Sequence, residues 1–136
     1  MDFVRSIAVA ASGLRAQSGR MRIIAENIAN ADSTADKAGA DPYRRKIPTF
    51  GQHVDRELGA TTVALGTVKK DETAFRTRLD PGHPAADAAG QVKLPNVNSL
   101  VETMDMREAQ RSYEANLNIV SATRRMISRT LEILRA

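Results

Sequence analysis

The sequence predicts a mainly α-helical fold with a small β-rich middle. Long N-terminal and C-terminal helices would form an elongated, antiparallel, coiled-coil-like hairpin, and a short β-hairpin would be inserted between them. Three observations predict this fold: both ends carry apolar repeats at spacings of three and four residues, neither repeat contains proline, and proline gathers in the middle. We therefore divide the chain into an N-terminal helix over residues 1–30, a middle segment over 31–97 and a C-terminal helix over 98–136.

The first helix is predicted by one apolar row whose spacings alternate between three and four residues, as in a coiled-coil seam. The row consists of Val4, Ile7, Ala11, Leu14, Ser18, Met21, Ala25 and Ile28. The arginines of this segment fall off the row, as expected for solvent-side residues. The alanine and serine positions on the row leave room for a partner helix to approach closely.

The second helix is predicted to begin at Ser99, which would form a capping box with Glu102 three residues later. Its apolar residues recur at every seventh position and have two companions on one side. They are Met106, Tyr113, Val120, Ile127 and Leu134, with Leu117 and Leu131 beside them. Such a helix would be about 55 Å long, whereas a compact domain of this size has a radius of gyration of about 14 Å. We therefore expect the remaining apolar surface to be buried against other subunits.

The middle segment is predicted to contain short strands separated by glycine and proline. The expected strands are Tyr43–Phe50, Thr61–Lys69 and Thr73–Leu79, with Lys70 and Asp71 as a hairpin turn. The stretch Ala31–Asp41 is rich in small and polar residues, so we expect a flexible loop there.

Composition excludes several classes of function. The chain has no cysteine, so it cannot form a disulfide or a thiolate metal site. Its formal net charge of +4 is mild and acids are interleaved with the bases, which makes a nucleic-acid interface less favoured. The longest apolar runs are too short to span a membrane, and no cleavable signal peptide is expected.

The densest basic run is Arg44-Arg45-Lys46. It is a candidate contact for a partner, and an equally favoured interpretation is a solvated strand edge that discourages aggregation. An alternative from another class is a basic coiled-coil protein that binds nucleic acid, although no aromatic platform accompanies the charge.

One short loop offers a superficial metal site, because His83 lies between Asp80 and Asp87. The prolines and glycine around His83 favour a rigid turn instead, since a metal site within one short loop needs more ligands. No nucleophile motif and no phosphate-binding glycine loop are present. We therefore expect no catalytic residue, no bound metal, no cofactor and no enzymatic activity.

Five stretches, which are spread in order along nearly the whole chain, resemble the axial proteins of the bacterial flagellum. They are Ala11-Ser12-Gly13-Leu14-Arg15-Ala16-Gln17; Glu26-Asn27-Ile28-Ala29-Asn30 with Thr34; Pro42-Tyr43-Arg44-Arg45-Lys46; Asp80–Pro84 with Asp87 and Gly90, followed by Pro95-Asn96-Val97-Asn98; and Arg111-Ser112-Tyr113-Glu114-Ala115-Asn116. Within that family the short middle segment is similar to that of the C-type proximal-rod subunits of the basal body.

The resemblance implies a structural subunit of the periplasmic rod that polymerises through its terminal helices and transmits torque. It implies export through the flagellar type III apparatus without signal cleavage. The implied partners are other copies of the chain, the rod-base adaptor, other proximal-rod subunits and the distal rod, with no nucleic acid and no membrane insertion.

The residues that we expect at the assembly interface combine the apolar rows with amides that could fix the register of the two helices. They are Ile7, Leu14, Met21, Asn27, Ile28, Asn30, Tyr113, Asn116, Leu117, Val120, Ile127 and Leu134.

Overall fold

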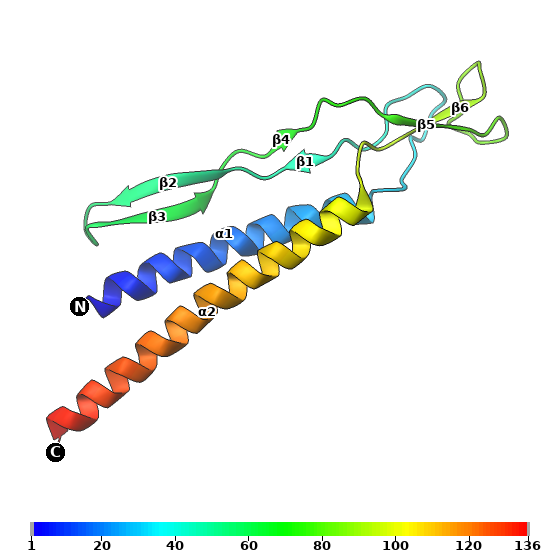
Figure 1. Ribbon diagram of the computed structural model, residues 1–136. Helices are drawn as coiled ribbons and strands as arrows, with labels where there is room; N and C mark the ends of the chain where they lie inside the picture. The colour runs from blue at the N-terminus through cyan, green and yellow to red at the C-terminus, as the bar shows by residue number, and fades with distance from the viewer. Residues whose placement is uncertain (1, 136) are drawn as a thin grey trace. The chain divides into compact units, whose positions relative to one another are not determined.

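The computed structural model describes residues 2–135, so Met1 and Ala136, the outermost residues of the two predicted helical segments, lie outside the described residues. Two long helices enclose six short strands in the sequence, as Figure 1 shows. The elements are α1 Phe3–Ala29, β1 Lys46–Ile47, β2 Phe50–Asp55, β3 Ala60–Leu65, β4 Lys69–Lys70, β5 Arg76–Leu79, β6 Gln91–Leu94 and α2 Ser99–Arg135. The predicted pair of long helices with a small β-rich middle is confirmed.

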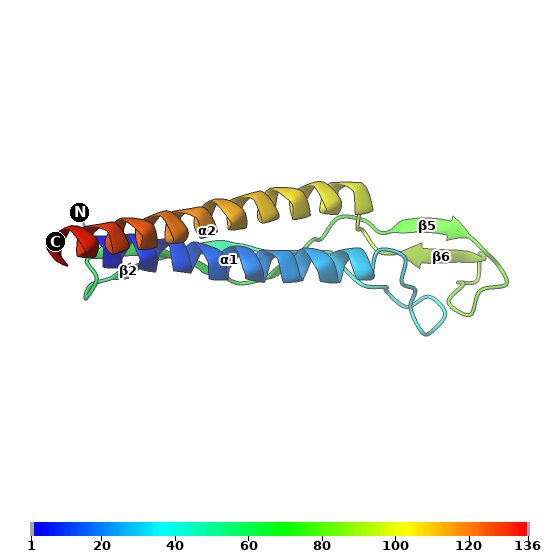
Figure 2. The ribbon, with the colours of Figure 1, turned by 90° about the horizontal axis from the view of Figure 1, so that it is seen from below.

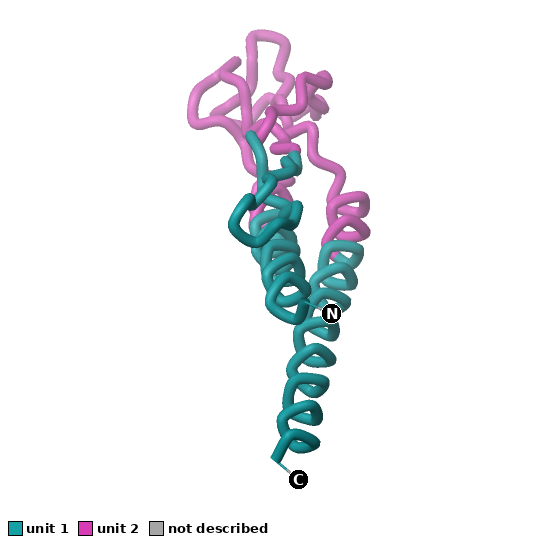
Figure 3. The backbone as a smooth tube through the Cα atoms, turned by 90° about the vertical axis from the view of Figure 1, so that its left-hand side faces the viewer, with its two compact units in different colours: residues 1–21, 49–67, 107–136 teal, residues 22–48, 68–106 magenta. Residues whose placement is uncertain are grey.

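The chain divides into two compact units, and each helix contributes to both (Figure 3). The first unit comprises the chain up to Met21, the segment Thr49–Thr67 and the chain from Arg107 onward. Its buried side chains are small: Ala10, Ser12, Ala16, Ala109 and Thr123.

In the first unit, β2 and β3 form an antiparallel hairpin that packs on α1. The Val63 backbone N–H donates to the Ser12 hydroxyl over 3.2 Å. A Cβ atom at Gly19 would lie 2.9 Å from a methyl carbon of Leu65. The absence of a side chain at Gly19 therefore lets the hairpin lie close to the helix.

The second unit comprises Arg22–Pro48 and Val68–Met106. It buries the larger apolar residues Ile23, Ile24, Val92 and Val97. Two antiparallel pairs lie in this unit, β1 with β4 and β5 with β6. Figure 2 shows β5 and β6 side by side.

The helices contact each other within each unit, and the contacts fix their direction. In the first unit Gly13 of α1 faces Asn116 of α2, and in the second unit Asn27 bonds to Glu102. Within the first unit, Val9 and Ala10, which precede Gly13, line a groove together with Ile119, which follows Asn116. The two helices therefore run in opposite directions in that unit, as the predicted hairpin requires.

The predicted strand pairing is wrong. Lys70 is not a turn residue but belongs to β4, where it pairs with Lys46. The actual tight hairpin joins β2 to β3 through a turn that ends at Gly59, whose φ of +59° suits glycine. The Asp55 carboxylate stabilises this turn by accepting hydrogen bonds from the backbone N–H groups of Glu57 and Leu58, at 3.0 and 3.1 Å.

The predicted capping box at the start of α2 is also wrong. The side-chain oxygen of Asn98 accepts hydrogen bonds from the N–H groups of Leu100 and Val101, at 3.0 and 3.4 Å, so Asn98 is the N-cap. Glu102 does not fold back on the helix start, because its carboxylate is bound by Asn27 and Arg45. The end of α1 has its own cap, since the Asn30 amide donates to the carbonyl of Glu26 over 2.9 Å.

The face of α1 that the chain buries differs from the predicted apolar row. The buried residues of α1 are Ala10, Ser12, Gly13, Ala16, Ile23, Ile24 and Asn27. Along the predicted row, Val4, Ser18 and Ala25 are exposed and the others are half-buried. Small residues face the hairpin and α2, where close approach is needed, and the chain itself covers the apolar row only in part.

Candidate assembly interface

A buried asparagine organises the second unit. Asn27 is 0% exposed. Its amide nitrogen donates to the Lys46 carbonyl at 2.8 Å and to the Glu102 carboxylate at 3.0 Å, and its amide oxygen accepts from the Tyr43 hydroxyl at 2.8 Å and the Lys46 N–H at 2.9 Å. An asparagine side chain has two donors and two acceptor positions, and all four are used. The sequence-based expectation that Asn27 bonds across the helix pair is met by the hydrogen bond to Glu102.

The buried carboxylate of Glu102 is the second centre of this cluster. The residue is 0% exposed and its carboxylate receives the Arg45 Nε donor at 2.5 Å. Arg45 also lies 3.5 Å from Asp71 and 3.7 Å from Asp105, while its backbone N–H donates to Asn96 over 2.8 Å. A buried charge is tolerated only when it is paired and hydrogen-bonded, and Glu102 satisfies both conditions.

We expect an anomalous titration of Tyr43, because burial, followed by the nearby carboxylates of Glu26 and Glu102, raises the pKa of its hydroxyl to about 12. The folded state then holds the phenol proton more tightly than the unfolded state does. The contribution of Tyr43 to stability is therefore complete below pH 10 and is lost as the pH rises through about 12.

This expectation is checked by following phenolate absorbance against pH for the wild type and for Tyr43→Phe. The difference between the two curves is the titration curve of the Tyr43 hydroxyl. A difference curve centred near pH 10 would show that the hydroxyl is not held in the cluster.

The basic run Arg44-Arg45-Lys46 is engaged inside the second unit. Arg44 lies over the ring of Phe75, 4.2 Å from its centroid, and donates to the backbone carbonyl of Asp71 at 3.0 Å. Arg45 is bound to Glu102 as described, and Lys46 forms an ion pair with Glu26. These cations tie the middle segment to α1 and α2.

In the first unit the two helices meet at Gly13. A Cβ atom there would lie 2.8–2.9 Å from the side-chain amide atoms of Asn116, closer than real Cβ contacts occur. The Asn116 nitrogen donates instead along its own helix, to the Ser112 carbonyl over 2.9 Å. Asn116 therefore acts as a spacer against a glycine, and among residues 2–135 its side-chain amide makes no hydrogen bond to α1.

We expect the effect of Gly13→Ala on the free energy of unfolding to change sign when the neighbouring Asn116 is replaced by alanine. In the wild type the new methyl group must displace the Asn116 amide, at a cost of about 1–3 kcal/mol. In an Asn116→Ala background that obstacle is gone, and alanine should stabilise the helix by roughly 0.5–1 kcal/mol over glycine. Urea unfolding of the four chains of this double-mutant cycle measures the coupling. Additive effects would mean that the two residues do not touch.

The residues predicted for the interface differ in how far the chain covers them. Asn27 alone is fully buried. The half-buried ones are Ile7, Leu14, Met21, Ile28, Asn30, Tyr113, Asn116, Val120 and Ile127. Leu117 is 46% exposed and Leu134 is 77% exposed. The chain brings Asn27 and Asn116 to the helix pair and leaves the apolar rows on both helices incompletely covered.

Sequence reasoning missed three residues of these contacts. Glu102 was interpreted as a capping residue, Asn98 was not recognised as the cap, and Gly13 was not given a packing role. A signal existed for Gly13, because a glycine inside a helix costs about 1 kcal/mol and usually has a packing reason. No local pattern distinguishes a buried Glu102 from a capping one.

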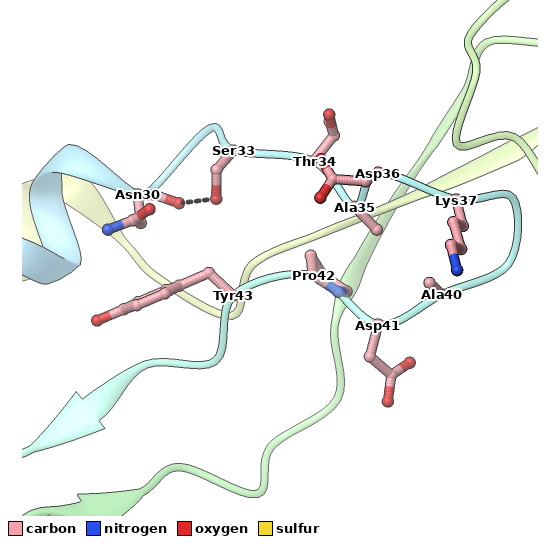
Figure 4. Close-up of a pocket in the computed structure, with 10 residues that line it drawn as sticks. All are labelled: Asn30, Ser33, Thr34, Ala35, Asp36, Lys37, Ala40, Asp41, Pro42 and Tyr43. Atoms are coloured by element: carbon pink, nitrogen blue, oxygen red, sulfur yellow. Dashed lines mark hydrogen bonds between the residues drawn. The ribbon is translucent and has the colours of Figure 1, made fainter.

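A hollow of about 460 Å³ lies beside the segment that follows α1. It is lined by Asn30, Ser33, Thr34, Ala35, Asp36, Lys37, Ala40, Asp41, Pro42 and Tyr43. Figure 4 shows the Ser33 hydroxyl bonded to the Asn30 carbonyl, a 2.9 Å contact, and the Asp41 carboxylate pointing away from the hollow. Asp41 instead pairs with Lys93 at 2.9 Å. The lining is a mixture of polar and apolar surface that is open to solvent, and it offers no converging set of ligands.

Among residues 2–135, no group of three or more histidine or acidic side chains is placed to hold a metal ion. Within the same residues, neither helix is both long enough and apolar enough to cross a membrane.

Comparison with known proteins identifies the family. A model of the flagella basal body rod proteins matches residues 7–35, and a model of the C-terminal region of flagellar basal body rod proteins FlgE, FlgF and FlgG matches residues 88–133. The flagellar basal-body rod protein FlgC of Agrobacterium fabrum is 52% identical over 128 residues, which cover 94% of this chain and 92% of the relative. This chain belongs to the FlgC family of flagellar basal-body rod proteins. The FlgC proteins of Salmonella typhimurium and Borreliella burgdorferi are 38% and 35% identical and cover 92% and 98% of this chain, with 92% and 99% of their own length matched.

Family membership makes the chain a structural subunit of the flagellar basal-body rod and places it in the basal body. The nucleic-acid-binding alternative has no support among these relatives. Both matched regions include most of a terminal helix, and each also contains one centre of the polar cluster, Asn27 in the first and Glu102 in the second.

Proposed function

We propose that this rod subunit has no enzymatic activity and polymerises through its terminal helices to build the proximal part of the rod and transmit torque. The observation that carries the proposal is that the chain itself covers the heptad rows of both helices only in part. Val4 and Ala25 on α1 and Leu117 and Leu134 on α2 are exposed. Uncovered apolar rows at heptad spacing are the surface that a neighbouring helix buries in a coiled coil.

The proposed assembly interface consists of the helical residues predicted above. On α1 and its cap these are Ile7, Leu14, Met21, Ile28 and Asn30, with Asn27 supporting them from within. On α2 they are Tyr113, Asn116, Leu117, Val120, Ile127 and Leu134. In this proposal the second unit stiffens the rod, because its ion pairs and hydrogen bonds connect the middle segment to both helices.

The proposed partners are copies of the chain, the rod-base adaptor, other proximal-rod subunits and the distal rod. Export through the flagellar type III apparatus without signal cleavage would deliver the chain to the periplasm. A partner contact by Arg44, Arg45 and Lys46 stays a prediction, and would use the part of each side chain that the intramolecular pairs leave free.

The experiment that tests this proposal follows circular dichroism and light scattering of the purified chain across concentration, alone and with other rod proteins. Because the monomer leaves its apolar rows partly exposed, neighbouring copies should bury them. We therefore expect large particles to form as the concentration rises, together with an increase in helicity. A chain that is fully helical and remains small with every rod protein would contradict polymerisation through these helices.

A further inference from the structure

The β2–β3 hairpin of the first unit has one covered edge and one free edge. β3 lies against α1, since the Val63 N–H donates to the Ser12 hydroxyl over 3.2 Å. β2 forms the other side of the hairpin, and its only strand neighbour within residues 2–135 is β3. Figure 1 shows β2 on the side of β3 that is away from α1. The outer edge of β2 is therefore a place where another strand can be added.

The hydrogen bonds of the hairpin determine which backbone groups of β2 point outward. The Gly66 N–H donates to the Thr49 carbonyl over 2.7 Å, so these two residues form a hydrogen-bonded pair. Such pairs alternate along an antiparallel ladder, so every second residue from Thr49 to Asp55 bonds to β3. The residues between them turn their N–H and C=O groups away from β3. They are Phe50, Gln52 and Val54.

A second hydrogen bond supports this assignment. Val63 is opposite Gln52, and the Val63 N–H donates to Ser12 of α1 and not to β2. Opposite residues that are not hydrogen-bonded to each other both turn their N–H groups outward, so the Gln52 N–H faces the free edge. Among residues 2–135, no backbone group outside the hairpin bonds to Phe50, Gln52 or Val54. Their N–H and C=O groups therefore remain available to a neighbouring strand.

This free edge lacks the features that usually prevent another strand from adding. β2 contains no lysine and no proline, and its register with β3 has no bulge. Its side chains are exposed from Phe50 to Val54, and the two apolar ones at the ends of this stretch are 45% and 64% exposed. An unprotected edge with exposed apolar side chains is a surface that a strand of another molecule covers.

The free edge is complementary to itself. When two copies of β2 lie antiparallel with their Gln52 residues opposite each other, Phe50 of each copy lies opposite Val54 of the other. All of these residues point outward, so they form the hydrogen-bonded pairs of the new ladder. An aromatic side chain opposite a β-branched one is a favourable cross-strand pair. Asp55 lies opposite Thr49, so no like charges meet across the edge.

The neighbouring registers fit less well. A shift by one residue would place the outward groups of one strand opposite residues that point inward. A shift by two residues in one direction places Pro48, which has no N–H, opposite Val54. The same shift in the other direction places Phe50 opposite Arg56, which belongs to the turn and not to the strand. The arrangement centred on Gln52 is the one that uses the whole edge.

We propose that β2 pairs antiparallel with β2 of a second copy of this chain, around a two-fold axis at Gln52. The two hairpins then form one four-stranded sheet in the order β3–β2–β2–β3. The contact goes beyond the proposed function, because it uses the middle segment and not the terminal helices. It is isologous and closes on itself, so it belongs to the unassembled chain and does not extend a rod. One pair of six-residue strands is a small interface, so we expect a weak dimer at high concentration.

The register is tested with introduced cysteines, since the chain has none. Gly51 lies opposite His53 of the second copy at a position that is not hydrogen-bonded, where Cα atoms are about 4.5 Å apart and a disulfide can form. A side chain at Gly51 has open space around it. Gly51→Cys and His53→Cys are mixed with mild oxidant and without other rod proteins. We expect the mixed disulfide in a yield several-fold above that of His53→Cys alone.

The His53→Cys chain alone is the control for register, because its two thiols are offset by two residues, about 7 Å along the strands, and lie beyond disulfide reach. Mass spectrometry distinguishes the mixed disulfide from the two symmetric ones. Equal yields of the mixed disulfide and of the control would overturn the proposed register.

Sedimentation velocity across concentration measures the dimer itself. Gln52→Lys places two positive charges opposite each other at the two-fold axis, so we expect dimerisation to weaken several-fold. Gln91→Lys makes the same change at an exposed residue of β6 and should leave dimerisation unchanged. A wild-type chain that is monomeric at every concentration, or two variants that dimerise equally, would contradict the β2 pair. Neither test uses other rod proteins, so a failure of polymerisation cannot be confused with a failure of this contact.

Discussion

Asn27→Asp should destabilise the second unit more than any other isosteric change in the chain. The substitution keeps the acceptors that bind the Tyr43 hydroxyl and the Lys46 N–H, but it removes both donors. One of those donors lies 3.0 Å from the Glu102 carboxylate, so the variant places two carboxylates in contact where both residues are fully buried. An uncompensated buried charge costs roughly 3–5 kcal/mol, which is a large part of the stability of an ordinary domain.

The pH dependence of this variant distinguishes charge repulsion from a general packing defect. The neighbouring carboxylate raises the pKa of the new aspartate in the folded state, so the folded chain binds a proton more readily than the unfolded chain. Stability should therefore be recovered at acidic pH, below the ordinary aspartate pKa, and lost as the pH rises through the raised value. Urea unfolding across pH measures this directly.

A matched control is Asn118→Asp, which makes the same chemical change at an exposed position of α2. We expect that control to change stability by less than about 0.5 kcal/mol. If Asn27→Asp and Asn118→Asp behave alike, the buried bond between α1 and α2 does not exist in solution. A loss of stability that does not depend on pH would point to packing and not to the carboxylate pair.

The two long helices could be predicted from sequence because their signal is local and repeated many times. Each apolar row extends over several turns without proline, and tertiary contacts did not need to be known. The pairing of strands could not be predicted in this way. The strand Phe50–Asp55 contains a glycine and is mostly exposed on both faces, so it shows no alternation, and its partner is selected by the Asp55–Gly59 turn.

The polar cluster was only half predictable for a similar reason. Asn27 lies near a helix end among apolar residues, and that position indicated a bond across the helices. Its partner Glu102 comes three residues after a serine at a helix start, and this spacing fits a capping box equally well. Burial of Glu102 by the middle segment decided between the two roles, and burial depends on residues far away in the sequence.

The predicted apolar row of α1 is not the core of the chain. Had that row been the core of the chain, its members would be buried, but Ser18 and Ala25 are exposed. The chain instead buries Ser12 and Gly13, where the hairpin and α2 approach closely. A heptad row that the monomer leaves partly exposed is the feature expected of a subunit whose neighbours cover that row on assembly.

Ala25→Arg should abolish assembly while leaving the monomer as stable as the wild type. The side chain of Ala25 is exposed in the monomer, so arginine meets no obstacle there and lies within a helix that accepts it. In the assembly, a long charged side chain would occupy the space that alanine leaves for a neighbouring helix, and its charge would have no water around it. Light scattering with rod proteins measures assembly, and urea unfolding measures stability.

Ala89→Arg is the matched control, because it makes the same substitution at an exposed loop residue of the second unit. Both chains gain one positive charge and one long side chain, so solubility and net charge change equally. Assembly lost in Ala25→Arg and retained in Ala89→Arg would place the interface on the uncovered row of α1. Assembly retained in both would mean that α1 meets its neighbours through another face, and the rod contact would then have to be sought on α2.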